Sequence, residues 1–278
     1  MKYAIKLYTA LSLIFILLLS ISGSISGVFG DFVYVGAFAL PAICGVYLSG
    51  ELHRKREEEA GVSLENKWYY KLDGESLKHF LPLVMPVILT VMLVSFLTAL
   101  LLSLLGLSNP PIEQSSLLKM LVMHALVPAI LEELLFRYVP MKLILPYSKS
   151  ACIVISSVYF ALIHCNLFSI PYALVAGVIF ISLDIAFDSV LPSLILHFLN
   201  NAMSVVMIKY CNSTTSYLIY VGICVAFLAV SVPFILKFKA VYKEKLNELK
   251  NGNKNIDSGY YPLLLIIPTV LVALMNLL

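Results

Sequence analysis

The residues of this sequence best suited to chemistry are a few ionisable side chains inside strongly apolar stretches. Glu132, Glu133 and Arg137 lie in the run LLKMLVMHALVPAILEELLFRYVPMKLILP. On insertion scales, a charged group near the middle of a membrane-length helix costs roughly 3 kcal/mol. Ionisable residues kept inside a membrane usually belong to functional sites. We therefore expect these three charges to serve a function that requires them.

The spacing of these residues predicts how they pair. Glu133 and Arg137 are four residues apart with the acid first, which is the favourable orientation for a contact along a helix. Glu132 lies about 100° round the helix from Glu133, so the same arginine serves both poorly. Glu132 is therefore expected to face another partner.

Two later apolar stretches carry further polar residues. His164 follows Phe160 by four positions in FALIH, and Asn201 follows His197 by four in HFLNN. Each spacing places its residues on one helix face. At a rise of 1.5 Å per residue, Glu132 lies roughly 15 Å from the cytoplasmic end of its span, and His164 and His197 lie roughly 21 and 10 Å from the starts of theirs. All three are therefore expected in the central part of a bilayer. We expect a shared cavity there.

The composition predicts a multi-pass membrane protein. The chain has 278 residues, of which 60% are hydrophobic and only 13% charged, with a mean hydropathy of +0.94. We expect an all-α transmembrane bundle of about eight or nine spans in a single domain, residues 1–278, with its site inside the membrane. The candidate spans are 7–29, 31–49, 79–106, 116–142, 150–166, 170–188, 190–210, 215–237 and 260–278. The first resembles a signal peptide, but we favour a retained span.

The polar intervals predict the topology. Residues 51–78 and 238–259 are rich in Lys and Arg and are expected to be cytoplasmic loops, with the N-terminus on the same side. Asp184 and Asp188 are expected near the cytoplasmic end of their span, within reach of water, in a structural role or at the edge of a pocket. The net charge of +3 gives no indication of nucleic acid binding.

Three motifs in this order resemble those of a known family. EELLFR matches EExxxR, FALIH matches FxxxH, and HFLNN matches HxxxN ending at Asn201. The chain resembles the CPBP (CAAX protease and bacteriocin-processing, or Abi) family of intramembrane endopeptidases, which includes the type II CAAX prenyl endopeptidases. The resemblance covers Glu132 to Asn201, within an expected catalytic core of about 79–210.

The resemblance implies a role for each motif residue. Glu132 and His164 would activate a water for attack on a peptide carbonyl, His197 and Asn201 would hold the oxyanion, and Glu133 with Arg137 would support the geometry. Glu132, His164 and His197 also form a possible zinc ligand set. The helix motif HExxH is absent, so the cofactor stays open, and we favour none.

The resemblance also sets the expected setting. It implies a lipid bilayer and a membrane-associated substrate: a prenylated CAAX-type C-terminus, a bacteriocin precursor or a pheromone precursor. The compact interval between His164 and His197 favours a prokaryotic member, and so a prokaryotic cell membrane. Bacteriocin self-immunity is a further expectation. Two other classes stay open, a proton-coupled transporter that uses the same polar groups as a relay and a non-catalytic immunity or scaffold protein.

Overall fold

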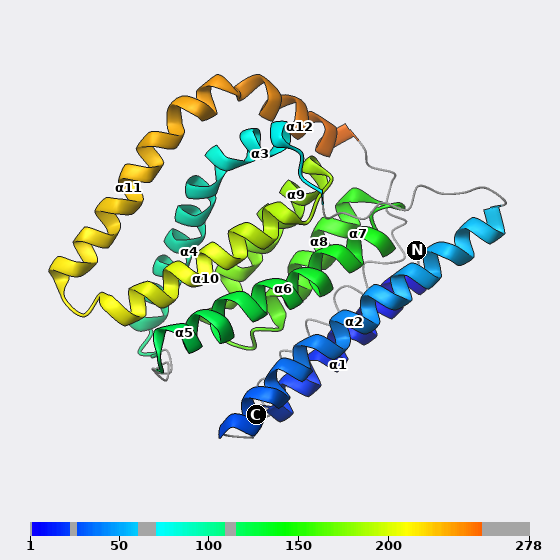
Figure 1. The fold of residues 1–278 in the computed structure, drawn as a ribbon, viewed down its shortest axis with the longest axis horizontal. Helices are drawn as coiled ribbons and strands as arrows, with labels where there is room; N and C mark the ends of the chain where they lie inside the picture. Colours follow the sequence, from blue (N-terminus) through cyan, green and yellow to red (C-terminus); the bar gives the residue numbers. More distant parts are fainter. Residues whose placement is uncertain (1, 23–26, 61–70, 109–114, 252–278) are drawn as a thin grey trace.

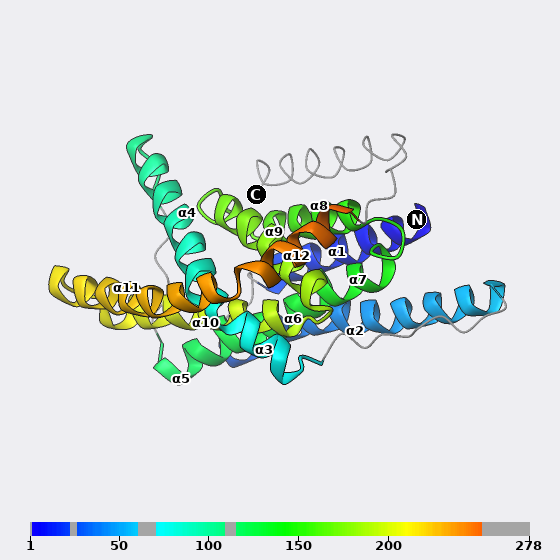
Figure 2. The same cartoon turned by 90° about the horizontal axis from the view of Figure 1, so that it is seen from above.

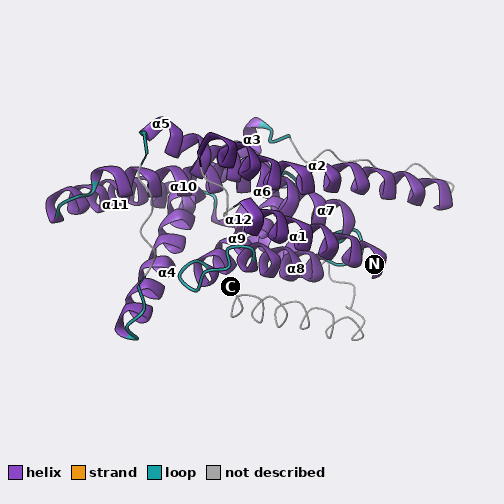
Figure 3. Ribbon diagram, turned by 90° about the horizontal axis from the view of Figure 1, so that it is seen from below, coloured by secondary structure: helices purple, strands orange, loops and turns teal. Residues whose placement is uncertain are grey.

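The secondary structure of the described residues is entirely helical. The computed structural model describes residues 2–22, 27–60, 71–108 and 115–251. Figure 3 shows helices joined by short loops throughout these ranges. The predicted span at 260–278 lies outside them. The all-α prediction is confirmed for the described part of the chain.

Within the described ranges, five helices are long and apolar enough to cross a membrane: Phe29–Glu59, Gly74–Leu104, Ile170–Phe187, Leu191–Tyr210 and Thr214–Lys237. Tyr3–Leu19 and Lys149–Leu162 are shorter apolar helices. The predicted number of eight or nine spans is not confirmed. The helix elements outside the region 117–143 are α1 (Lys2–Ser22), α2 (Gly27–Ala60), α3 (Gly74–Phe80), η1 (Leu81–Leu83), α4 (Val84–Leu104), α8 (Lys149–Leu162), α9 (Ile170–Phe187), α10 (Leu191–Tyr210), α11 (Thr214–Lys237) and α12 (Lys239–Asn251).

Serine side chains mark the start of several helices. The Ser148 hydroxyl accepts the backbone N–H of Ala151 at the start of α8. Ser213 and Ser216 form a reciprocal capping box at the start of α11. The residue before α10, Val190, has no side chain able to cap the helix. The exposed N–H groups of α10 must therefore be satisfied from elsewhere.

The segment predicted as one span at 116–142 is a single helical path with two widened turns. Its elements are α5 (Leu117–Met120), the π segment η2 (Leu121–Leu126), α6 (Val127–Glu133), the π segment η3 (Leu134–Tyr138) and α7 (Val139–Leu143). Each π segment ends two residues before a proline, Pro128 or Pro140. The residue before each proline donates its N–H to the carbonyl five positions back. Proline removes a regular hydrogen bond and crowds the preceding turn, which accounts for both widened turns.

The charged stretch after the second predicted span begins as helix. Helix α2 continues through it to Ala60, and Arg54 pairs with Glu51 and Glu58 along the helix surface. Such three- and four-residue spacings support a solvated helix. The later polar interval is also largely helical, because Lys239–Asn251 forms α12. Both predicted loops, 51–78 and 238–259, therefore begin with helix.

The helices pack so that the 117–143 path and α8 to α10 form the centre. Figures 1 and 2 show α1 lying along α2 on one side and α11 with α4 on the other. Helix α10 packs against η2 and α6, and α8 packs against α9. A chain of edge-to-face aromatic contacts runs from Tyr8 through Phe136 to Phe160, with centroid distances of 6.4 and 5.9 Å. This chain connects α1 to the central helices.

Helices α8 and α9 come close together at Gly177. A Cβ atom at this position would lie 2.9 Å from the backbone Cα of Ser157. Backbone atoms cannot move aside as a flexible side-chain end can. Glycine at position 177 therefore sets the distance between α8 and α9.

We expect Gly177→Ala to destabilise the protein by about 1–3 kcal/mol, because the added methyl forces the two helices apart. The measurement is thermal unfolding in detergent micelles. Gly222→Ala in α11 is the matched control, since no atom lies within 4 Å of its added Cβ. Equal unfolding temperatures for wild type and Gly177→Ala would show that the close approach imposes no constraint.

Candidate active site

Glu133 is held on two sides by buried partners. Its Oε2 lies 3.2 Å from Arg137 Nε, the contact that the four-residue spacing predicts. Its Oε1 accepts a 2.7 Å hydrogen bond from His197 Nδ1. Glu133 and Arg137 are almost completely buried. Helix α6 is thereby tied to the third motif on α10.

Arg137 is enclosed by polar and aromatic groups. Its Nη1 donates to the Phe136 carbonyl at 3.0 Å and lies 3.4 Å from the Ser156 hydroxyl. Ser156 donates to the same carbonyl. The guanidinium lies over the Phe160 ring, 4.3 Å from its centroid. A cation stacked on a ring and paired with a carboxylate keeps a fixed orientation.

Glu132 occupies a different position from its neighbour. It is buried, and its Oε2 lies 3.9 Å from His197 Nε2. Within the described residues this oxygen has no hydrogen-bond partner. The two nitrogens of His197 thus face the two adjacent glutamates, and His197 is the partner that the sequence left unnamed for Glu132.

His164 lies at the end of α8 beside the same aromatic ring. Its Nδ1 is 2.9 Å from the Phe160 carbonyl oxygen, which can only accept, so Nδ1 carries the proton. In the neutral ring, Nε2 then holds a lone pair. The Phe160 ring makes edge contacts with His164 and His197, at centroid distances of 5.3 and 5.6 Å. In the described structure no hydrogen bond or ion pair joins His164 to Glu132.

Asn201 follows His197 by one turn on α10 and is half-buried. Its side-chain oxygen accepts a hydrogen bond from Asn200 Nδ2 at 3.3 Å. Its own amide N–H groups therefore remain available for another acceptor. The structure connects Glu132 to His197, His197 to Glu133, and Glu133 to Arg137. His164 is joined to this series through Phe160, and Asn201 lies one turn from His197.

The expectation that water reaches Asp184 is wrong. This side chain is completely buried, and its Oδ1 accepts the backbone N–H of Ser193 at 2.9 Å. The turn between α9 and α10 folds over it. Asp188, one turn further on, is exposed and adopts a left-handed backbone conformation.

The residues do not fit the zinc ligand set of Glu132, His164 and His197. Among the described side chains, no group of three His, Cys, Asp or Glu residues is arranged to hold a metal ion. Both nitrogens of His197 face carboxylates, and a ligand nitrogen would have to face the metal. We therefore derive no step through a metal.

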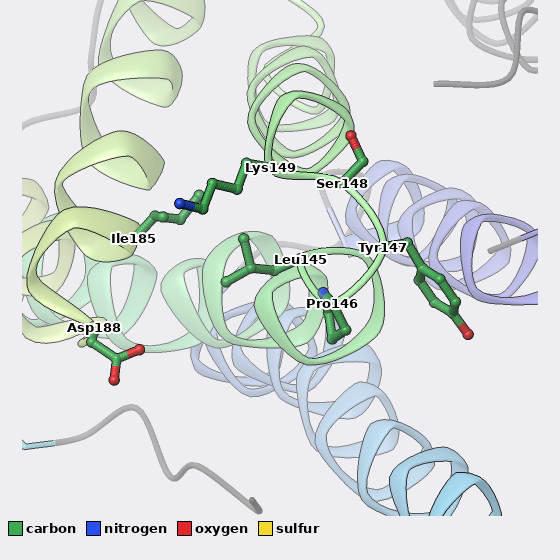
Figure 4. Close-up of a pocket in the computed structure, with 7 residues that line it drawn as sticks. All are labelled: Leu145, Pro146, Tyr147, Ser148, Lys149, Ile185 and Asp188. Carbon is green, nitrogen blue, oxygen red and sulfur yellow. The ribbon is translucent and has the colours of Figure 1, made fainter. Parts of the chain in front are cut away.

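A hollow of about 230 Å³ lies elsewhere, between the end of α7 and the end of α9. Figure 4 shows Lys149 reaching across it toward Ile185, with Asp188 at its margin. It shares no lining residue with the polar centre. None of Glu132, His164 and His197 lines this hollow, so it is not the shared cavity expected from the sequence.

Two features of the centre were missed by the sequence reasoning. Phe160 was noted only for its spacing from His164, yet its ring contacts Arg137, His164 and His197. Ser156 supports Arg137 from the preceding turn of α8. The signal available was their position: residues 156, 160 and 164 follow one another at helical spacing on a single face.

The comparison with known families agrees with the motifs. Residues 114–203, about a third of the chain, match the family described as type II CAAX prenyl endopeptidase Rce1-like. No curated protein and no solved structure matches the chain. All three motifs, from Glu132 to Asn201, lie inside the matched range. Their order on apolar helices and this match together confirm the resemblance: residues 114–203 are similar to the type II CAAX prenyl endopeptidase Rce1-like family, and the apolar helices indicate an integral membrane protein.

Proposed function

We propose that this protein is an intramembrane endopeptidase that hydrolyses a peptide bond in a membrane-associated protein or peptide, with Glu132 as the base that activates water. The observation that carries the proposal is the difference between the two glutamates. Both oxygens of Glu133 have close charged or polar partners: Oε1 lies 2.7 Å from His197 Nδ1, and Oε2, which accepts no hydrogen bond in the described structure, lies 3.2 Å from Arg137 Nε. The ion-pair contact of Glu132 Oε2 is longer, 3.9 Å to His197 Nε2, and this buried oxygen accepts no hydrogen bond in the described structure, so it can accept one from a water molecule.

The first step is attack on the peptide carbonyl. Glu132 takes a proton from water as the water oxygen bonds to the carbonyl carbon, and His164 Nε2 accepts a hydrogen bond from the same water. Fixing Nδ1 of His164 on the Phe160 carbonyl supports this, because it leaves Nε2 as the acceptor. The carbonyl oxygen then carries the negative charge.

The oxyanion is stabilised from α10. The free amide N–H of Asn201 can donate to it, and so can Nε2–H of His197 when the ring is doubly protonated, since Nδ1–H remains on Glu133. Collapse of the intermediate breaks the C–N bond, and the proton taken by Glu132 passes to the leaving amine. Glu133 and Arg137 act by holding His197 and α6 in place.

The substrate class follows from the family and is part of the proposal. A prenylated CAAX-type C-terminus is the first choice, with bacteriocin and pheromone precursors as the other members of the class. We propose a prokaryotic cell membrane with the N-terminus in the cytoplasm, because the Lys- and Arg-rich segments of α2 and α12 would then share that side. Bacteriocin self-immunity is one physiological setting for such cleavage.

We expect Glu132→Gln and His164→Ala to lower cleavage by about 10²- to 10⁴-fold, the range of a general base, while the proteins remain folded. The measurement compares protein termini in membrane and secreted fractions of cells expressing equal amounts of each variant. Glu58→Gln, the same change at an exposed position on α2, is the control.

Three results would contradict the assignment. Cleavage by Glu132→Gln at the wild-type rate would show that Glu132 is not the base. Identical termini with and without the wild-type protein, together with uptake into vesicles that depends on a pH gradient, would indicate a transporter. Full protection of cells by Glu132→Gln would indicate a scaffold that acts by binding.

We expect Arg137→Met to destabilise the protein by about 3–5 kcal/mol, because it leaves Glu133 buried without its cation. Arg137→Lys should destabilise the protein less than Arg137→Met, because it keeps the charge. It should still lower cleavage, since an ammonium cannot reproduce the planar guanidinium. Thermal unfolding and peptide cleavage in micelles measure the two effects.

Arg54→Met is the control for Arg137, because Arg54 forms its ion pairs on the exposed part of α2 and should change the unfolding temperature little. An Arg137→Met protein as stable as Arg54→Met would mean that the buried pair does not hold the site together.

A further inference from the structure

The start of α10 depends on a side chain from the helix before it. Helix α10 begins at Leu191 after Val190, which offers no cap. The Asp184 carboxylate, on α9, accepts the N–H of Ser193 in the first turn of α10 at 2.9 Å. The backbone carbonyl of Asp184 also accepts the N–H of Ser189 at 3.0 Å. One residue therefore fixes both ends of the turn between α9 and α10.

The hydrogen-bonded turn is one helical turn before His197 on α10. Ser193 precedes His197 by four residues, so both lie on the same face of α10. His197 in turn contacts Glu133 at 2.7 Å and lies 3.9 Å from Glu132. A rotation or slide of the first turn of α10 would carry His197 away from both glutamates.

The burial of the Asp184 carboxylate is costly and needs an explanation. It is completely buried, and its Oδ2 has no hydrogen-bond partner in the described structure. Burying a carboxylate costs free energy unless its partners compensate, so a neutral residue would pack here more cheaply. An apolar residue, however, could not cap α10.

We propose that Asp184 is a positioning residue for cleavage: by holding the first turn of α10 through the Ser193 N–H, it fixes His197 against Glu132 and Glu133. The inference rests on the proposed function and adds to it a residue outside the three motifs. Asp184 acts through His197 and does not touch the reacting atoms.

The experiment compares Asp184→Ala and Asp184→Asn in the purified full-length protein. Asparagine keeps an oxygen that can accept the Ser193 N–H, whereas alanine removes it. Two readouts are needed: kcat and KM for a fluorogenic farnesylated peptide ending in a CAAX sequence, and amide hydrogen exchange of residues 191–197. Asp188→Asn is the matched control, because it makes the same change one turn away at an exposed position whose left-handed backbone asparagine tolerates.

We expect Asp184→Ala to lower kcat by about 10- to 100-fold, as for a site displaced by about 1 Å, with KM little changed and faster exchange in residues 191–197. Asp184→Asn and Asp188→Asn should keep kcat and exchange within about threefold of wild type. A general loss of structure would speed exchange throughout the chain instead of in this turn.

Wild-type kcat and exchange in Asp184→Ala would overturn the proposal. So would an Asp184→Asn protein with wild-type exchange that loses as much kcat as alanine, because the charge would then matter and not the hydrogen bond. If Asp184→Ala does not fold, Asp184→Asn decides alone by keeping or losing kcat. If the wild type cleaves no peptide, the proposed function fails, while the exchange readout still decides whether Asp184 holds α10.

Discussion

The arrangement of the centre depends on the buried contact between Glu133, Arg137 and His197. Removing charges from water is costly, and a buried pair repays that cost only when its geometry is good and its remaining polar atoms are used. Here Nη1 donates to the Phe136 carbonyl and the Phe160 ring lies over the guanidinium, while Nη2 has no hydrogen-bond partner in the described structure. This contact joins α6, η3, α8 and α10, and the other features of the centre take their positions from it.

The two adjacent glutamates contact opposite nitrogens of a single imidazole, that of His197. Neighbouring residues on a helix point about 100° apart, yet the nitrogens of one imidazole ring also point in different directions. His197 can therefore face Glu133 with Nδ1 and Glu132 with Nε2. One carboxylate is immobilised by this arrangement and the other is left available, although the two share almost the same burial.

The sequence predicts the long apolar helices well, because their apolar runs are long and Pro or Ser stands at their starts. Helices α9, α10 and α11 begin and end within about one residue of the predicted spans 170–188, 190–210 and 215–237. It also predicts the Glu133–Arg137 contact, which depends only on helical spacing. The burial of Asp184 and the placement of His197 between two carboxylates depend on how separate helices pack, and no local pattern encodes that. The helical charge run of α2 was missed because its ion pairs, not its apolar content, maintain it.

The two π turns change the direction in which side chains point along the helical path that carries the glutamates. Each widened turn holds one residue more than a regular turn, and one residue corresponds to about 100° of rotation. The direction of Glu132 and Glu133 is thus set by the extra residue in Leu121–Leu126, and that of α7 by the one in Leu134–Tyr138. A chain that kept all three motifs but lost one residue before Pro128 would present its carboxylates to a different neighbour. The motifs alone therefore do not fix which neighbours the carboxylates face; the number of residues in the two π segments also matters.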